Sequence, residues 1–356
     1  METNYSTFRK EELKKIALIT GITGQDGAYL AKFLLDRNYR IVGCYRRSST
    51  LNFWRLQELM IYENNCLELV DLDITDPVAV SNVVRKHKPH EIYNLAAQSF
   101  VTSSFENPVL TANINSLGPL YFLEAIRIMD KNIRFYQAST SEMYGLIQSS
   151  SQDENTPFYP RSPYAVSKLY AHWITVNYRE SYGVFAACGI LFNHESPLRG
   201  EEFVTKKITS AVARIKHGIQ TTLFLGNLNA RRDWGYAADY VEGMWKMLQA
   251  EKPENYVLAT GKNETIRNFA KLAFKEAGIE IKFRGAKENE VGIDTQTGDT
   301  IIRIDKKLYR PAEVDVLLGN STKANNELNW KARTSIQELA KVMVEYDLQS
   351  IGQSIK

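Results

Sequence analysis

The chain has 356 residues, 44% of them hydrophobic and 24% charged, which is enough for one large α/β domain with a smaller one appended. Its 44 basic and 41 acidic residues leave a net charge of only +3, so general binding of nucleic acid is not implied. The sequence shows no signal peptide and no membrane-spanning stretch, and its three separated cysteines indicate neither a disulfide framework nor a zinc site. We therefore expect a cytoplasmic protein without a metal.

The first half of the chain alternates short apolar runs with segments of helical period. These patterns predict strands at 16–19, 41–44, 67–70, 91–95 and 134–138, and helices at about 28–36, from 77, at 113–129 and from 162. Strands and helices in strict turn indicate βαβ units. The fold class is thus α/β: a Rossmann-type doubly wound parallel sheet with a smaller mixed α/β substrate-binding domain.

The second half is less regular after about residue 193. Residues 256–260 could form a late strand of the main sheet, and the tail from about 265 has the pattern of a small mixed unit. We therefore predict a dinucleotide-binding domain over 13–193 and about 233–263. The substrate-binding domain would cover about 194–232 and 264–345, and residues 1–12 would be a flexible extension.

A glycine-rich segment follows the first predicted strand and opens the first helix. Gly21, Gly24 and Gly27 suit a tight turn, the close approach of a pyrophosphate, and packing of the helix on the strand. The amino terminus of the helix would present free N–H groups to the phosphates. The segment predicts a dinucleotide site with contacts from these glycines and from Thr23, Gln25 and Asp26.

The residues after the second predicted strand indicate which dinucleotide binds. An NAD enzyme carries an acid there for the ribose 2′-hydroxyl, whereas this chain has Arg46, Arg47 and Ser48. Guanidinium groups bind phosphate in a planar, often bidentate geometry, so this pattern favours the 2′-phosphate of NADP. Asp73, after the third strand, is expected to contact the adenine or to cap the following helix.

Two further segments carry groups suited to catalysis. Thr140 and Glu142 lie at the end of a predicted parallel strand, where such folds place their ligands. Tyr164 and Lys168 are four residues apart and so share one face of a helix. A nearby ammonium would favour the phenolate and lower the pKa of the tyrosine, which would make Tyr164 a general base toward an alcohol.

Several longer stretches extend these motifs: FYQASTSEMYG (135–145), the stretch 156–183 around SPYAVSK, ILFNHESP (190–197), RDWGYAADYV (232–241) and RPAEVDVLLG (310–319). With them the chain resembles, from about Lys15 to about Trp330, the GDP-mannose 4,6-dehydratases, which are extended short-chain dehydrogenases/reductases of the NAD-dependent epimerase/dehydratase family. The resemblance implies an NADP-dependent hydro-lyase that converts GDP-mannose to GDP-4-keto-6-deoxy-mannose.

The family's mechanism gives each catalytic residue a role by resemblance. Tyr164 would take the C4 hydroxyl proton while hydride leaves C4, Thr140 would hydrogen-bond the same oxygen, and Lys168 would bind the nicotinamide ribose. Glu142 would remove the C5 proton and protonate the departing C6 hydroxyl, after which hydride returns to C6. A 4-epimerase or 4-reductase on this fold needs no such carboxylate, so Glu142 argues against that alternative. An intact set of catalytic groups argues against a non-enzymatic NADP-binding regulator.

The resemblance also implies contacts to the ligands. For the cofactor it adds Ile74, Leu95, Ala96, Ala97, Tyr164, Lys168 and His194. For the GDP-sugar it implies Gln98, Ser99, Ser104, Glu106, Asn193, Val204, Lys207, Gly226, Asn227, Arg232, Arg310 and Glu313.

The chain departs from the commoner family pattern at three places toward the sugar. Many members have His in place of Phe100, the stretch from Thr102 differs from Ala-Val-Ser, and Leu198 replaces an Arg. These departures leave GDP-D-glycero-D-manno-heptose as an alternative substrate. A loop like Arg46–Ser49 reaches a neighbouring subunit in tetrameric members, so we expect a homo-oligomer, with a dimer through the helices near 113–129 and 162–182.

Overall fold

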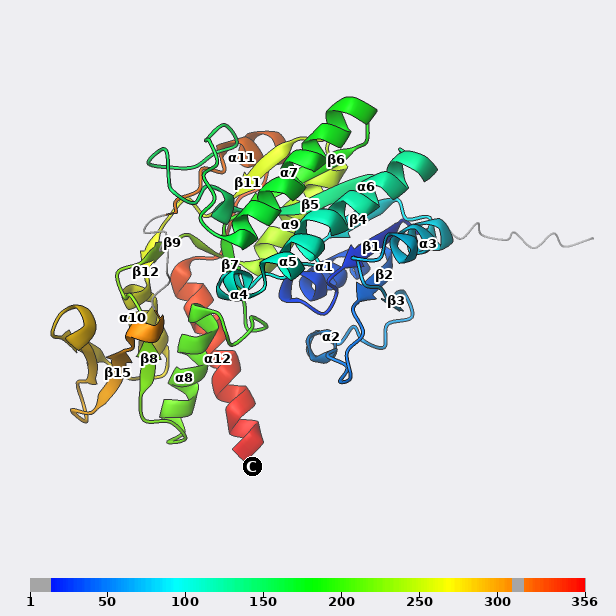
Figure 1. Ribbon diagram of the computed structural model, residues 1–356. Helices are drawn as coiled ribbons and strands as arrows, with labels where there is room; N and C mark the ends of the chain where they lie inside the picture. Colours follow the sequence, from blue (N-terminus) through cyan, green and yellow to red (C-terminus); the bar gives the residue numbers. More distant parts are fainter. Residues whose placement is uncertain (1–13, 309–316, 356) are drawn as a thin grey trace, which may run out of the picture.

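A seven-stranded parallel sheet lies at the centre of the computed structural model, which describes residues 14–308 and 317–355 (Figure 1). The order across the sheet is β11-β6-β5-β4-β1-β2-β3, and each neighbouring pair is parallel. The strands are β1 (Ile16–Thr20), β2 (Arg40–Tyr45), β3 (Leu67–Asp71), β4 (Glu91–Asn94), β5 (Arg134–Thr140), β6 (Ala186–Leu191) and β11 (Asn255–Leu258). The order reverses between β1 and β4, as in a doubly wound sheet, which confirms the predicted fold class. The segment near 256–260 does join this sheet, as β11.

Alternate residues of each strand bury against helices on opposite faces of the sheet. Ile19 of β1 belongs to a core with α1 and α9, whereas Leu18 packs with α3 and α6. Side chains that alternate between two buried faces explain why these strands read as continuous apolar runs. The helices of this part are α1 (Gln25–Leu35), α2 (Trp54–Glu58), α3 (Pro77–His87), α4 (Val101–Glu106), α5 (Pro108–Ala112), α6 (Gly118–Met129), α7 (Pro163–Tyr182), α9 (Ala237–Gln249) and α11 (Thr322–Leu328).

The ends of α7 are determined by local sequence. The Ser162 hydroxyl accepts a hydrogen bond from the Ala165 N–H at 3.1 Å, and Pro163 occupies the first helical turn. At the other end Gly183 adopts a left-handed conformation with φ +68°. These signals fix where the helix begins, and therefore which turn carries Tyr164 and Lys168.

The predicted helix at 113–129 is not a single α-helix. Residues 113–117 form a π-helical turn, η1 (Asn113–Leu117), directly between α5 and α6. A π turn widens the helix by one residue and is common at functional sites. The period of hydrophobic residues alone does not reveal it, because the widened turn keeps the apolar face.

A smaller unit with its own core lies beside the main sheet (Figure 1). Its four-stranded sheet has the order β13-β14-β15-β8, and it packs on three helices. Its elements are α8 (Val204–Lys216), β8 (Leu223–Leu225), α10 (Ile266–Glu276), β13 (Ile281–Arg284), β14 (Val291–Asp294), β15 (Thr300–Ile304) and α12 (Ile336–Ile355), with 3-10 turns η3 (Lys287–Asn289) and η4 (Lys306–Leu308). The domain boundaries stay a prediction, and the extension 1–12 lies outside the described residues. Across the described ranges, no helix is both long and apolar enough to cross a bilayer.

Short strands connect the two units. The parallel pair is β7 (Asn193–Glu195) with β10 (Trp234–Tyr236), and the antiparallel pair is β9 (Arg231–Arg232) with β12 (Glu264–Thr265). Asp233, between β9 and β10, is 1% exposed. Its carboxylate accepts hydrogen bonds from the Thr260 N–H and hydroxyl and from the Gly261 and Gly319 N–H groups, at 2.7–3.4 Å. One buried carboxylate thus ties three segments together.

Asp233 makes the stability of the protein depend on pH. Burial, opposed by these hydrogen bonds, raises the pKa of its carboxyl from 3.8 to about 6. Because the pKa is raised in the folded state, the native protein keeps this proton between about pH 4 and 6, where the unfolded chain loses it. The contribution of Asp233 to the free energy of unfolding is therefore greatest below that window and declines as pH rises through it. At about 1.4 kcal/mol per pH unit, the decline is about 3 kcal/mol.

We expect the Asp233→Asn variant to lack this dependence, because an amide does not ionise in the window. The difference in unfolding free energy between the wild type and the variant, measured by urea unfolding, should shrink as pH rises from about 4 to 6. A difference that stays constant or grows over that interval would contradict the assignment.

Candidate active site

A pocket of about 500 Å³ opens at the carboxyl edge of the main sheet. It is lined by the loops that follow β1, β2, β3 and β4, at the point where the strand order reverses. The predicted cofactor residues that line it are Gly21, Thr23, Gly24, Gln25, Asp26, Gly27, Arg46, Ser48, Asp73, Ile74, Leu95, Ala96 and Ala97. Gln98 and Ser99, predicted for the substrate, also line this pocket.

The glycine loop can hold its shape only without side chains. Gly21 has φ +69°, and a Cβ there would lie 2.9 Å from the Ala96 nitrogen. A Cβ on Gly27 would lie 2.3 Å from the Gly21 carbonyl oxygen, which is far inside contact distance. The missing side chains leave a cradle at the amino terminus of α1 that fits the pyrophosphate of a dinucleotide.

Buried polar contacts hold the strand ends around this cradle. The Thr20 hydroxyl donates to Asn94 Oδ1 at 2.8 Å and accepts from the Leu95 and Ala96 N–H groups at 3.0 Å. Asn94 in turn donates to Gln137 Oε1 at 2.9 Å. These consecutive hydrogen bonds link β1, β4 and β5, and so position the loops of the pocket relative to the strand that ends in Thr140.

The basic loop after β2 is open to solvent. Arg46, Arg47 and Ser48 are all exposed, and the described lining of the pocket includes Arg46 and Ser48 without Arg47. The Arg47 N–H donates to Asp71 Oδ1 at 3.2 Å. Asp73 lies in the pocket, and the residue that caps α3 is Asp76, whose carboxylate accepts from the first turn. Of the two roles expected for Asp73, capping is therefore taken by another residue.

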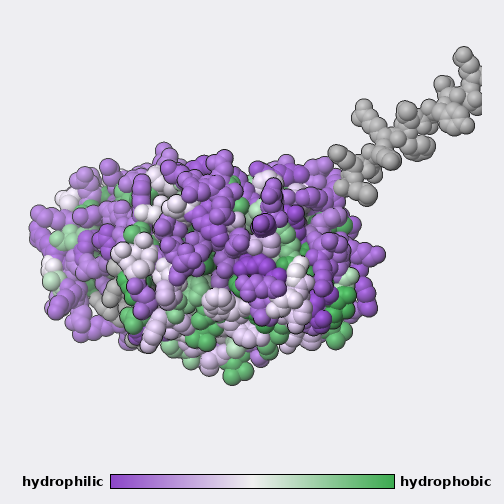
Figure 2. Space-filling view, turned by 90° about the horizontal axis from the view of Figure 1, so that it is seen from above, coloured by the Kyte–Doolittle hydropathy of each residue, from purple (hydrophilic) through white to green (hydrophobic). Residues whose placement is uncertain are grey.

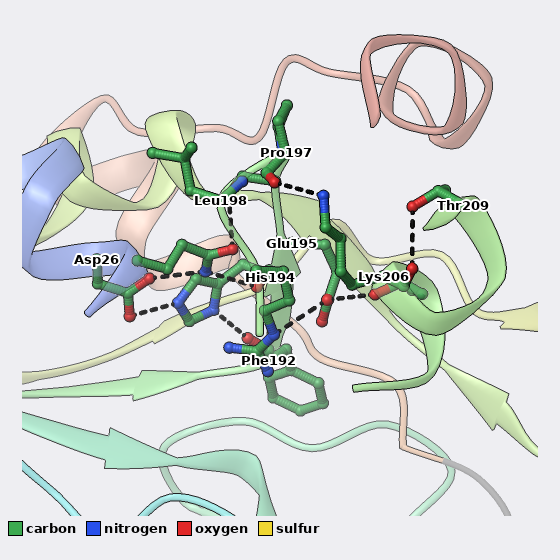
Figure 3. Close-up of polar contacts among 12 residues, drawn as sticks. Asp26, Phe192, His194, Glu195, Pro197, Leu198, Lys206 and Thr209 are labelled. Carbon is green, nitrogen blue, oxygen red and sulfur yellow. Dashed lines mark hydrogen bonds and ion pairs between the residues drawn. The ribbon is translucent and has the colours of Figure 1, made fainter. Parts of the chain in front are cut away.

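His194 reaches the cofactor loop through Asp26 (Figure 3). Its Nε2 is 2.8 Å from Asp26 Oδ2, its Nδ1 is 2.8 Å from the Phe192 carbonyl oxygen, and its ring stacks on Tyr240. Burial alone would raise the pKa of Asp26, but the charge and hydrogen bond of His194 lower it to about 2. Asp26 correspondingly raises the pKa of His194 against the effect of burial. Both ring nitrogens are engaged within the protein, so His194 positions Asp26; the direct cofactor contact expected of His194 stays a prediction.

The four predicted catalytic residues come from β5, the turn after it, and α7. Thr140 is the last residue of β5, and its hydroxyl accepts from the Glu142 N–H at 3.2 Å. Glu142 is half-buried in the 3-10 turn η2 (Ser141–Met143). Tyr164 and Lys168 are buried in the first turns of α7, and Lys168 Nζ donates to the Ala138 carbonyl oxygen at 2.9 Å.

The predicted lowering of the tyrosine pKa is not what the structure shows. Burial raises the pKa of Tyr164 to about 12, with the Thr140 hydroxyl opposing this effect and the Glu142 charge adding to it. Burial likewise lowers the pKa of Lys168 to about 8. Desolvation acts on both groups and favours their neutral forms, which opposes the attraction expected between phenolate and ammonium.

The π turn positions a residue that the sequence did not indicate. Asn115 of η1 accepts from the Gln98 N–H at 2.9 Å and donates to the Gln98 carbonyl oxygen at 3.0 Å. Its amide also donates to Ser167 Oγ at 3.1 Å. Asn115 thereby fixes the loop after β4 against the catalytic helix. No spacing rule could reveal this role, because the three segments meet only in the fold.

A second pocket, of about 290 Å³, lies between the two units. Predicted substrate residues that line it are Asn193, Val204, Lys207, Gly226, Asn227 and Arg232, and the departures Phe100 and Thr102 line it as well. Neither pocket lining, as far as the structure describes them, includes Ser104 or Glu106; the Ser104 hydroxyl donates to the Val101 carbonyl oxygen, and Glu106 is exposed. Arg310 and Glu313 lie outside the described residues.

Four charged residues that line the pockets were not among the predicted site residues: Glu195, Arg199, Glu202 and Lys307. Arg199 lines the larger pocket, and Glu195 lines the smaller one. Both follow β6 in the stretch ILFNHESP and just beyond it, so the signal that could have found them was their place at the end of a central strand.

Comparison with known proteins places this geometry in a family. The family model described as GDP-mannose 4,6 dehydratase matches residues 18–343. A GDP-mannose 4,6-dehydratase from Sinorhizobium fredii is 53% identical over 340 residues, which cover 94% of this chain and 97% of that protein.

Solved structures share the fold at lower identity. The dTDP-glucose 4,6-dehydratase DesIV from Streptomyces venezuelae, with NAD and TYD bound, is 22% identical with a TM-score of 0.80, and the match covers 95% of this chain and 98% of that one. RMD from Pseudomonas aeruginosa, complexed with NADPH, is 21% identical with a TM-score of 0.74 and the same coverage. These two likenesses concern the fold alone.

Proposed function

The chain belongs to the GDP-mannose 4,6-dehydratase family, and from that premise we propose that it is a hydro-lyase that converts GDP-mannose to GDP-4-keto-6-deoxy-mannose. The observation that carries the proposal is the grouping of Thr140, Glu142, Tyr164 and Lys168 at the carboxyl end of β5. Thr140, Tyr164 and Lys168 suit the oxidation of an alcohol, and the carboxylate of Glu142 beside them can carry the proton that an elimination reaction must move.

A nicotinamide dinucleotide in the larger pocket would supply the hydride acceptor for C4 and the hydride donor for C6. Tyr164 accepts the proton of the C4 hydroxyl, and the Thr140 hydroxyl hydrogen-bonds the same oxygen. Because burial keeps Tyr164 protonated, its phenol proton must leave before it can act as the base. Lys168, whose pKa burial lowers to about 8, would take that proton in its neutral form. Glu142 takes the C5 proton, which the C4 ketone acidifies, and delivers it to the departing C6 hydroxyl.

The smaller pocket suits a nucleotide diphosphate. Lys207 and Arg232 supply positive charge there, and the backbone around Gly226 and Asn227 offers polar groups for a base. GDP-D-glycero-D-manno-heptose is a second candidate, because Phe100 and Thr102, two of the departures from the family pattern, line this pocket. Different side chains at these two positions change the space and the hydrogen bonds that the pocket offers to the substrate.

The proposed activity predicts a product lighter by one water molecule. Purified protein with NADP⁺ in catalytic amount should convert GDP-mannose, the manno-heptose, or both, without net accumulation of NADPH, because the hydride taken from C4 returns to C6. Mass spectrometry of the products reads the outcome. An unchanged substrate mass with both compounds would contradict the proposal.

Glu142→Gln provides the control for the elimination step. The amide is nearly isosteric but cannot carry the C5 proton, so we expect dehydration to fall by about 100-fold or more. Binding of GDP-mannose should change little. Full dehydratase activity in this variant would show that Glu142 is not the proton carrier of the elimination step.

We propose NADP as the dinucleotide. Arg46 and Ser48 line the larger pocket beyond β2 and suit a 2′-phosphate. Arg46→Ala should raise the Kd for NADP⁺ by about 10- to 100-fold, since it removes a charged hydrogen bond, and leave the Kd for NAD⁺ nearly unchanged. Isothermal titration calorimetry with both dinucleotides measures this. Equal losses for the two would refute recognition of the 2′-phosphate by Arg46.

We also propose that the chain forms a homo-oligomer through α7 and its neighbours. Val166, Tyr170 and Trp173 lie on one face of α7 and are 55%, 42% and 54% exposed. Figure 2 shows a mostly hydrophilic surface with apolar residues gathered along the lower edge of that view. An exposed apolar face of this kind is typical of an interface.

Trp173→Glu should shift the assembly toward smaller species, because the charge would be buried at the interface. Sedimentation velocity measures the size, and Ile219→Glu, at a site 57% exposed after α8, serves as the matched control. The proposal fails if both variants sediment as the wild type does, or if the wild type is already monomeric.

A further inference from the structure

An ion pair between Glu195 and Arg199 spans the two pockets. Glu195, the last residue of β7, is 2% exposed and lines the smaller pocket. Arg199 lines the larger one, and its Nε lies 3.1 Å from Glu195 Oε2. The Thr205 hydroxyl of α8 donates a hydrogen bond to the same carboxylate. A single charge pair therefore has its acid in one site and its base in the other.

The segment between the two residues is held on several sides. Ser196 Oγ donates to Gln25 Oε1 at 2.7 Å in the glycine loop. Lys206 Nζ donates to the Pro197 carbonyl oxygen at 2.8 Å, and Arg55 Nε donates to the Leu198 carbonyl oxygen at 2.7 Å. The Arg199 guanidinium also stacks over the Phe203 ring at 3.5 Å. Because these contacts hold the backbone from Glu195 to Arg199, the segment cannot move away to relieve a change of charge at either of these two residues.

We propose that Glu195 and Arg199 set the anion affinity of both pockets, each acting on the pocket that it does not line. The inference rests on the proposed function, in which the larger pocket takes a dinucleotide and the smaller one a GDP-sugar. Both ligands carry a negatively charged diphosphate. Arg199 offsets the Glu195 carboxylate beside the GDP-sugar, and Glu195 offsets part of the Arg199 charge that faces the dinucleotide.

The effect of each charge on the opposite pocket has a definite sign. Without the Arg199 charge, the buried Glu195 carboxylate is uncompensated next to the diphosphate that Lys207 and Arg232 attract, so GDP should bind more weakly. Without the Glu195 charge, the guanidinium acts undiminished on the dinucleotide, so NADP⁺ should bind more tightly. A carboxylate so far from bulk water is poorly screened by solvent, which makes both effects measurable.

The test uses three variants of the full chain, freed of bound dinucleotide: Arg199→Gln, Glu195→Gln and the double variant. By calorimetry, Arg199→Gln should weaken GDP binding on the order of 5- to 30-fold, and Glu195→Gln should strengthen NADP⁺ binding by a similar factor. The double variant should restore GDP affinity toward the wild-type value, because no uncompensated carboxylate remains. Glutamine at position 195 can still accept the hydrogen bond from the Thr205 hydroxyl, in the single variant and in the double variant alike.

Asp347→Asn is the matched structural control. Asp347 pairs with Lys206 in a neighbouring buried ion pair, and the linings of the two pockets, so far as they are described, contain neither residue. This variant should lower the melting temperature and leave both affinities unchanged. If Glu195→Gln alone does not fold, Arg199→Gln and the double variant still decide the question through GDP affinity.

Two results would overturn the inference: unchanged GDP affinity in Arg199→Gln, or weaker NADP⁺ binding in a folded Glu195→Gln. Weaker binding in that variant would mean that Glu195 only holds Arg199 in place. Failure of the wild type to bind GDP and NADP⁺ would instead count against the proposed function, so the two failures are distinguishable.

Discussion

The close contact between the amino terminus of α1 and the loop after β1 is the constraint on which the rest of the site depends. Gly27 packs so near the Gly21 carbonyl that a single methyl group would not fit. This contact aims the free N–H groups of α1 along the carboxyl edge of the sheet, where the loops after β2, β3 and β4 also end. The larger pocket exists because those loops surround a helix end that no side chain obstructs.

The stretch from β6 through Arg199 gives the molecule its second organising feature. Here the chain leaves the central sheet and enters the smaller unit, and within a few residues it contributes Asn193 and Glu195 to one pocket and Arg199 to the other. His194, between them, pairs with Asp26 at the amino terminus of α1. The two pockets therefore share one short, well-anchored segment.

Burial determines the resting protonation of the catalytic groups. It raises the pKa of Tyr164 from 10.0 to about 12 and lowers that of Lys168 from 10.5 to about 8, so the two values move apart in the direction that favours the neutral form of each group. Thr140 ends β5 and Glu142 lies in the turn that follows, where the Glu142 N–H donates to the Thr140 hydroxyl.

Sequence alone determined the fold class and the glycine loop and indicated four candidate catalytic positions, because each depends on local patterns: strand and helix in alternation, glycines at a strand end, and a spacing of four along a helix. Only the tertiary structure decided the π turn that carries Asn115, the engagement of His194 with Asp26, and the pairing of Glu195 with Arg199. Those arrangements depend on which segments meet across the fold. The pKa of Tyr164 was also decided there, because desolvation depends on the whole surrounding structure and not on the neighbouring residues in the chain.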